Sequence, residues 1–310
     1  MTKKICSLWV EKFRPKSIKD VVMPKSFHIF FDKIIKSGDV PNLLLSSSMP
    51  GTGKSTVSKA LCHDLSSDYI YINASEAGGI DTLRNQIKEF AMTKSFNGKL
   101  KIVILDEADG LTPTFQAALR SFIESYASNC RFILTCNYIN KIIPALREGR
   151  TMTWDFNMSK AEYKDELLSA MKARIIGILK FEKVQYDENS ISKIVEALFP
   201  SMRKMIALCQ KYYDTYGKID EGIISFKNVG NELVEFIKEH KLTEARAYIN
   251  SNGYSYTDVF KNLFDNLVPI MTKNKSQAII TIAQYEYQCG FSTAPDIQVA
   301  AALCELCSLI

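Results

Sequence analysis

The chain has 310 residues, of which 46% are hydrophobic and 24% charged, so it has room for two or three globular domains. Its formal net charge of +5 permits an anionic partner but does not require one. Because no run of about 18 uncharged apolar residues occurs and the N-terminus lacks a signal-like apolar segment, we expect neither a membrane span nor secretion.

Between residues 40 and 156, short apolar segments alternate with segments of helical periodicity. Such alternation is typical of a mostly parallel sheet with helices on both faces. The predicted strands are 43–48, 69–75, 101–106, 131–137 and 151–156, and the predicted helices are 54–65, 80–92, 113–127 and 139–148. Thr112 and Pro113 supply an N-cap and a first-turn proline for the third of these helices.

After residue 156 the strand pattern stops and helical patterns follow. Ser159 and Glu162 have the spacing of a capping box, which predicts a helix that ends near residue 180. Further helices are predicted over 188–199, from 200 onward, and five times within 230–310, with a linker at 216–222. The predicted domains are an α/β domain (1–157), a helical domain (158–222) and a second helical domain (223–310).

Eight cysteines are present, and most lie in apolar stretches, as reduced and buried thiols of a cytoplasmic protein do. Cys304 and Cys307 have the two-residue spacing of a metal or redox pair. Because no second pair and no neighbouring histidine accompany them, we interpret both as small core residues of a terminal helix.

The segment SMPGTGKST, residues 48–56, follows the first predicted strand and precedes a helix. This is the setting of a phosphate-binding loop, in which glycines let backbone N–H groups turn toward phosphate oxygens. Lys54 would bind the β- and γ-phosphates, and the hydroxyl of Ser55 would ligate Mg²⁺. Ser48 stands where the full pattern has its first glycine, so the motif is incomplete.

Polar side chains end the third and fourth predicted strands. Asp106 and Glu107 close the strand of KIVILDEAD, and Asn137 closes that of FILTCN. Because parallel strands end at one edge of a sheet, these residues should lie beside the phosphate loop. Asp106 would hold Mg²⁺ directly or through water, and Glu107 would polarise the water that attacks the γ-phosphate. Asn137 would orient that water or sense the γ-phosphate, so the sequence predicts a Mg²⁺-dependent ATPase.

The motifs SMPGTGKST, VILDEAD, ILTCN and FPSMRKMI, in this order, resemble those of the AAA+ ATPases. The segment WVEKFRPKSIKDVV, residues 9–22, is similar to the adenine-binding segment of sliding-clamp loaders, among them replication factor C small subunits. The block GTGKSTVSKALCHDL is most similar to the large ATPase subunit of bacteriophage clamp loaders. The resemblance implies a AAA+ P-loop domain with a parallel five-stranded sheet, a helical lid and a helical collar that holds subunits in a ring. It is strong over 8–210 and only architectural over 230–310.

The resemblance also implies roles for individual residues. The residues expected around the adenine are Val10, Glu11, Lys12, Phe13 and Val22, with Arg14 and Pro15 fixing their segment. Those expected around the phosphates are Gly51, Thr52, Gly53, Lys54, Ser55 and Thr56. Arg203 would be the sensor-2 arginine that reaches the γ-phosphate. An arginine in the first turn of a helix is unfavourable unless an anion lies nearby, which agrees with that role.

In clamp loaders, the arginine of a Ser-Arg-Cys motif reaches the ATP of the neighbouring subunit. Here the corresponding segment is PALREGRTMTWDF, without that motif. Counting back from Phe156 places Arg150 at the arginine-finger position, whereas counting forward from Pro144 favours Arg147. We take Arg150 as the finger and Arg147 as the alternative.

Four further residues correspond to the coupling and DNA-facing helices of the family. Gln116 and Arg120, one turn apart, would couple Glu107 to DNA and to the neighbouring subunit, so that Glu107 stays inactive until DNA threads the ring. Arg84 and Lys88 would face a central channel and contact DNA phosphates. Ordinary solvent-exposed side chains are the alternative interpretation of all but Gln116.

The predicted function is an ATP-dependent clamp-loader subunit that opens a DNA polymerase processivity clamp and loads it at primer-template junctions. Hydrolysis to ADP and phosphate would be triggered by DNA and clamp. The expected partners are other loader subunits (further copies plus a small partner subunit), the clamp and primer-template DNA, in the cytoplasm or, for a viral protein, the host cytoplasm. The alternatives are another AAA+ DNA machine, such as a branch-migration motor or an origin loader, and a ring subunit that does not hydrolyse ATP.

Overall fold

The computed structural model describes residues 8–74, 80–95, 98–227, 231–252 and 256–310. The chain divides into two compact units, Met1–Glu221 and Gly222–Ile310. The first unit contains both the predicted α/β domain and the predicted lid, and the contact pattern does not divide it further. The boundary between those two parts therefore stays a prediction.

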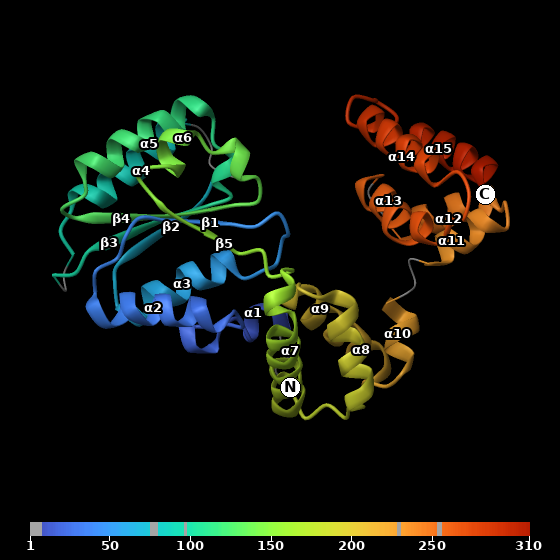
Figure 1. Cartoon of the computed structure of the whole chain (residues 1–310), viewed down its shortest axis with the longest axis horizontal. Helices are drawn as coiled ribbons and strands as arrows, with labels where there is room; N and C mark the ends of the chain where they lie inside the picture. The colour runs from blue at the N-terminus through green and yellow to red at the C-terminus, as the bar shows by residue number, and fades with distance from the viewer. Residues whose placement is uncertain (1–7, 75–79, 96–97, 228–230, 253–255) are drawn as a thin grey trace, which may run out of the picture. The chain divides into compact units, whose positions relative to one another are not determined.

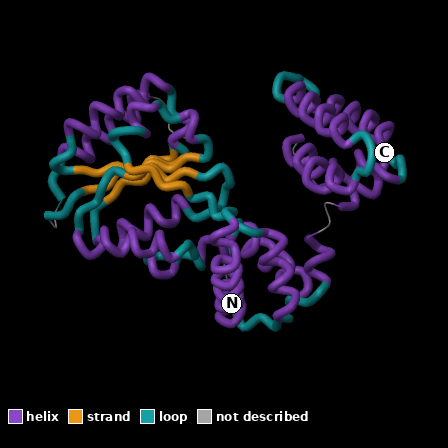
Figure 2. Tube along the Cα trace, in the orientation of Figure 1, coloured by secondary structure: helices purple, strands orange, loops and turns teal. Residues whose placement is uncertain are grey.

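The first unit is built on a five-stranded parallel sheet (Figure 2). Its strands are β1 (Leu43–Ser46), β2 (Tyr69–Asn73), β3 (Lys101–Asp106), β4 (Cys130–Cys136) and β5 (Met152–Asp155), in the order β2-β3-β4-β1-β5. Every residue of β3 is buried, as expected of a strand covered on both faces. The predicted parallel five-stranded sheet is confirmed.

Helices cover both faces of this sheet (Figure 1). One face carries α2 (Lys25–Ser37) and α3 (Lys54–Leu65), and the other carries α4 (Ile80–Met92), α5 (Pro113–Ser125) and the short α6 (Pro144–Arg147). The alternation of side chains along β3 divides the core accordingly. Ile102 and Ile104 join the core with α2 and α3, whereas Val103 and Leu105 join that with α4 and α5.

Two predicted helix features are wrong. The helix predicted over 139–148 is interrupted, because Pro144 has no backbone N–H and holds the preceding residue in an extended conformation. It is replaced by a 3₁₀ turn, Ile139–Lys141, and by α6. The capping box of Ser159 is also absent, since α7 (Ala161–Phe181) begins after Lys160 and the Ser159 hydroxyl instead lies 3.1 Å from Met49 Sδ. By contrast, Thr112 caps α5 as predicted, accepting a hydrogen bond from the Phe115 N–H.

Gln116 holds α5 against the segment between β4 and α6. Its side chain is 1% exposed; its Nε2 donates to the carbonyls of Leu111 at 3.0 Å and Lys141 at 2.9 Å, and its Oε1 accepts from the Ile143 N–H at 2.8 Å. Arg120 is exposed on the same helix. Although they are one turn apart, Gln116 is buried and Arg120 is exposed, so the two residues do not form one exposed surface.

Replacing Gln116 with leucine should lower the free energy of unfolding by about 2–4 kcal/mol, because buried backbone groups then lose their partners. Chemical denaturation of the purified chain measures this loss. Ser121→Ala, an exposed change on the same helix, is the matched control and should stay within about 0.5 kcal/mol of the parent. A Gln116→Leu variant as stable as this control would show that the buried amide contributes little.

The predicted lid corresponds to α7, α8 (Glu188–Leu198) and α9 (Met202–Tyr216), and the N-terminal segment packs against these helices. In α1 (Trp9–Lys12), the Trp9 ring stacks on Tyr213 with 5.6 Å between centroids, and the backbone N–H of Trp9 donates to Gln210 Oε1 at 2.7 Å. Arg174 of α7 donates to the carbonyl of Phe13 at 2.9 Å. The segment that was expected to bind adenine is thus packed against α7 and α9.

The second unit is helical. Its helices are α10 (Gly222–Lys227), α11 (Asn231–Lys238), α12 (Leu242–Asn252), α13 (Tyr256–Asn262), α14 (Lys275–Cys289) and α15 (Pro295–Leu309). Residues of α11 to α15 share one apolar core. Cys307 belongs to this core, but Cys304 is exposed, so only one of the two was correctly interpreted as a core residue. Within the described ranges, no three potential metal ligands cluster and no helix is long and apolar enough to span a membrane.

Candidate nucleotide-binding site

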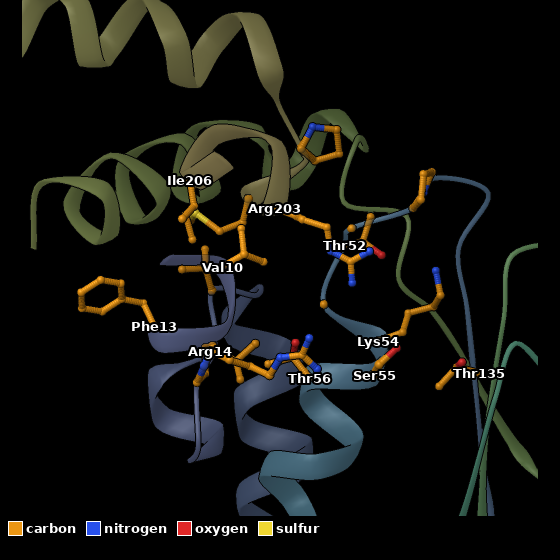
Figure 3. A pocket seen from close by; sticks show the side chains of 18 of the residues that line it. Val10, Phe13, Arg14, Thr52, Lys54, Ser55, Thr56, Thr135, Arg203 and Ile206 are labelled. Carbon is orange, nitrogen blue, oxygen red and sulfur yellow. The ribbon is translucent and has the colours of Figure 1, made fainter. Parts of the chain in front are cut away.

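A cavity lies in the first unit, where the carboxyl ends of the strands meet α1, the N-terminus of α3 and the start of α9 (Figure 3). The predicted site residues that line it are Val10, Phe13, Val22, Gly51, Thr52, Gly53, Lys54, Ser55, Thr56, Asp106, Glu107, Asn137 and Arg203. The predictions from the loop, the strand ends and the lid therefore converge on one place.

The loop before α3 is shaped for a group that approaches its backbone closely. Gly51 and Gly53 have φ of +79° and +101°, a conformation that favours glycine. A Cβ on Gly51 would lie only 2.7 Å from Ser201 Oγ at the start of α9. The buried hydroxyl of Thr52 has no hydrogen-bond partner among the described residues. An unpaired polar group beside a helix N-terminus fits an anionic ligand such as a triphosphate.

Lys54 connects the loop to the end of β4. Its side chain is buried, and Nζ donates to Asn137 Oδ1 at 2.9 Å and to the carbonyls of Ser47 and Met49 at 3.4 Å each. Burial lowers the pKa of Lys54, against the opposing effect of nearby anionic groups that include Asp106. A phosphate held by this ammonium group would lie next to the amide of Asn137.

Asp106 is the centre of a hydrogen-bond network. Its Oδ1 accepts from Ser55 Oγ at 2.7 Å and from the hydroxyl of Thr135, and its Oδ2 accepts from the hydroxyl of Tyr71. Burial alone would raise the pKa of Asp106, but the hydrogen bonds from Thr135, Tyr71 and Ser55 lower it overall. An ionised carboxylate next to a serine hydroxyl is a donor set that suits Mg²⁺, so the residues present fit this ion.

Glu107 follows in a strained backbone conformation. Its φ is 55°, in the left-handed region that non-glycine residues rarely adopt, and its N–H donates to Thr135 Oγ1 at 3.2 Å. Strain of this kind clusters at functional sites, although Ser66, Lys183, His240 and Asn274 also have positive φ and do not line the cavity. Glu107 is exposed and lines the cavity next to Asp106.

The side chains of Glu11 and Lys12 do not line the cavity, which corrects the expectation for both. Glu11 pairs with Arg14 at 2.5 Å, and Lys12 pairs with Glu182 of the lid at 2.5 Å. Their exposure on α1 directs them away from the pocket while Val10 and Phe13 face it. The apolar wall also includes Met171 and Ile206 of the lid, which the sequence motifs did not indicate.

Arg203 closes the cavity from the start of α9, next to the phosphate loop, where a Cβ on Gly51 would lie 3.5 Å from the Cβ of Arg203. It is an exposed residue in the first turn of α9, and Figure 3 shows its guanidinium beside Thr52. Together with Lys54 and the N-terminus of α3, it supplies positive potential to the pocket. This position agrees with the anion-binding role expected for Arg203.

Arg14 and Pro15, expected to fix the adenine-binding segment, also line the cavity, whereas the residues predicted for DNA binding, coupling and the arginine finger lie outside it. Arg84 and Lys88 are exposed on α4. Arg150 donates to Glu124 Oε1 from Nε at 3.1 Å and from Nη2 at 2.7 Å, and the Nε of Arg120 lies 3.7 Å from the same oxygen. Arg147 pairs instead with its neighbour Glu148 at 2.6 Å. The geometry of one chain thus gives Arg147 and Arg150 no contact with that chain's own pocket.

Tyr71 and Thr135 are site residues that the sequence motifs did not indicate. Thr135 lies within FILTCN, one strand away from Asp106, and Tyr71 lies on β2 at the opposite side of β3. The signal available was strand alternation, which places residues two apart on one face. Strand alternation indicates which face of the sheet Tyr71 and Thr135 occupy, but it does not predict their contacts with Asp106. Those contacts depend on the register between strands, which neither strand's sequence contains alone.

The fold and the pocket define a P-loop ATPase of the AAA class. The model of the ATPase family associated with various cellular activities (AAA) matches residues 44–159. Among solved structures, the Thermotoga maritima RuvB Holliday junction branch migration motor aligns with a TM-score of 0.57 at 14% identity, covering 82% of this chain and 91% of that chain. A point mutant of the same RuvB aligns with a TM-score of 0.60, also at 14% identity and with the same coverages. At such identities the likeness concerns the fold alone.

Curated relatives narrow the class. The chain is 33% identical to the replication factor C small subunit of Saccharolobus solfataricus, over 96% of this chain and 94% of that protein. It is 35% identical to the sliding-clamp-loader large subunit of Enterobacteria phage T4, over 80% of this chain and 78% of that protein. The chain belongs to the family of AAA+ clamp-loader subunits. These two identities do not separate the archaeal small subunit from the phage large subunit.

Proposed function

We propose that this chain is the ATP-hydrolysing subunit of a ring-shaped loader that opens a polymerase processivity clamp and places it at primer-template junctions. Its partners would be further copies of the chain, a small partner subunit, the clamp and the DNA, with hydrolysis triggered by DNA and clamp. The observation that carries the proposal is the single cavity in which Lys54, Asp106 and Glu107 converge beneath Arg203, in a chain of clamp-loader ancestry.

The chemistry assigns one task to each group around the triphosphate. Lys54 and the N–H groups at the start of α3 bind the phosphates, and Arg203 adds charge at the γ-phosphate. Magnesium, held by Ser55 and Asp106, would neutralise charge that develops on the phosphate oxygens. The carboxylate of Glu107 accepts a proton from the water that attacks the γ-phosphorus.

The proposed DNA contacts rest on two exposed cations. Arg84 and Lys88 are four residues apart on α4 and therefore lie on one side of the helix. Contacts with phosphates would bind a duplex without reading its sequence, as a loader of primed sites requires. For coupling, we propose that Arg120 acts at the surface of α5 and Gln116 in the interior. Gln116 is hydrogen-bonded to Lys141 and Ile143, in the segment that leads from Asn137 to Arg150.

The proposal is tested by ATP turnover of the assembled complex with primed DNA and the clamp of the same replication system, added singly and together. Turnover should rise most when both are present, and Lys54→Ala should abolish it, because phosphate binding is lost. Stimulation by branched DNA alone would favour a branch-migration motor. An assembled ring that binds ATP but never hydrolyses it would favour the scaffold subunit.

A further inference from the structure

Tyr71 lies beside the magnesium-binding position but belongs to no nucleotide-binding motif. In the register of β2 with β3, Tyr71 is paired with Ile104, and Asn73 is paired with Asp106. Tyr71 and Asp106 are therefore diagonal neighbours on the same face of the sheet, a spacing that an aromatic side chain can bridge. The hydroxyl of Tyr71 bridges it and donates to Asp106 Oδ2.

The two oxygens of Asp106 have different partners. Oδ1 accepts from Ser55 and Thr135, on the side of the phosphate loop and of β4, whereas Oδ2 accepts from Tyr71 on β2. A carboxylate held at both oxygens cannot rotate freely about its Cβ–Cγ bond. The bond from Tyr71 therefore acts with those from Ser55 and Thr135 to fix the orientation of the carboxylate plane.

Tyr71 is itself held in place by α3. The ammonium group of Lys59 lies 3.6 Å from the centroid of the Tyr71 ring, a cation–π contact. Lys59 follows Ser55 by four residues on α3, so the helix that supplies the serine hydroxyl also supports the tyrosine. Tyr71 is 36% exposed and lies on the edge strand β2, so it is at the rim of the sheet rather than in the core.

We propose that Tyr71 is a positioning residue for magnesium, which orients the carboxylate of Asp106 so that Asp106 and Ser55 hold the ion together. This inference rests on the proposed function, because it assumes that Mg²⁺ and ATP bind in this cavity. Hydrogen bonds to a metal-ligating group from such outer partners change metal affinity by about 10- to 100-fold. Tyr71 thus sets the magnesium requirement of the site without touching the nucleotide.

The test is Tyr71→Phe, which removes one hydroxyl and keeps the ring on Lys59. The measurement is the Mg²⁺ concentration that gives half-maximal binding of a fluorescent ATP analogue to the purified full chain. We expect this concentration to rise about tenfold. Binding of the analogue in EDTA and the melting temperature without ligand should stay unchanged, since a purely structural role would alter them. Tyr69→Phe is the matched control, because Tyr69 lies two residues earlier on the same strand and is also exposed.

The possible outcomes separate this inference from the proposed function. If Tyr71→Phe requires the same Mg²⁺ concentration as the parent and Tyr69→Phe, Tyr71 does not position the ion, although the ATPase proposal stands. The inference also fails if Tyr71→Phe weakens binding equally with Mg²⁺ and in EDTA. If the parent chain shows no Mg²⁺-dependent binding of the analogue, alone or assembled with its partner subunits, the proposed function itself is wrong.

Discussion

Replacing Glu107 with glutamine is expected to lower ATP turnover of the assembled loader by about 10²- to 10⁴-fold, the usual contribution of a general base. Glutamine keeps the size of the side chain and the left-handed backbone at this position, but it cannot accept the proton of the attacking water. Asp106 and Ser55 remain to hold magnesium, so binding of ATP should be nearly unchanged. Phosphate release and titration with a fluorescent ATP analogue measure the two effects separately.

The matched control is Glu196→Gln, the same chemical change at an exposed position on α8 that does not line the cavity. It should leave both turnover and binding as in the parent. If Glu107→Gln kept more than about a tenth of the parent's turnover, Glu107 would not be the principal base. If the Glu107→Gln variant lost ATP binding together with turnover, Glu107 would contribute to binding ATP rather than to the hydrolysis step.

The fold was largely predictable because its strands are short, apolar and evenly separated by helical patterns. β3 illustrates this, since all six residues of Lys101–Asp106 are buried and the predicted range is the observed one. α2 (Lys25–Ser37) was missed although Phe27, Phe31 and Ile34 have helical spacing. Local signals failed where tertiary contacts or proline prevailed, as at Pro144 and at the unused cap of Ser159.

The candidate site was predictable where its groups stand next to one another in the sequence. Lys54 and Ser55 are adjacent in the phosphate loop, and each motif carries its own chemistry. What motifs do not contain is strand register and the packing of remote segments. The contact of Tyr71 with Asp106 depends on register, and the pairing of Lys12 with the lid depends on how α1 is packed.

Replacing Arg150 with alanine is expected to lower turnover stimulated by DNA and clamp by about 10³-fold or more, with nearly unchanged ATP binding. The reason is that Arg150 is proposed to stabilise the transition state in the neighbouring subunit, and it does not line its own chain's cavity. In the single chain, Arg150 is paired with Glu124. This ion pair is exposed and therefore weak, so Arg150 can leave Glu124 to bind a more highly charged triphosphate. Arg120, 3.7 Å from Glu124, still compensates that carboxylate once Arg150 has left.

Arg147→Ala is the matched comparison, because it makes the same change three residues earlier in the sequence. If Arg147→Ala abolished stimulated turnover and Arg150→Ala did not, the finger would be Arg147. If both variants kept the stimulated turnover of the parent, neither residue would be the finger. Action in trans has its own signature in rings mixed from Arg150→Ala and Glu107→Gln subunits. There, an intact finger on one subunit meets an intact base on its neighbour, so part of the turnover that neither variant has alone should return. A finger that acted within its own chain would give no recovery.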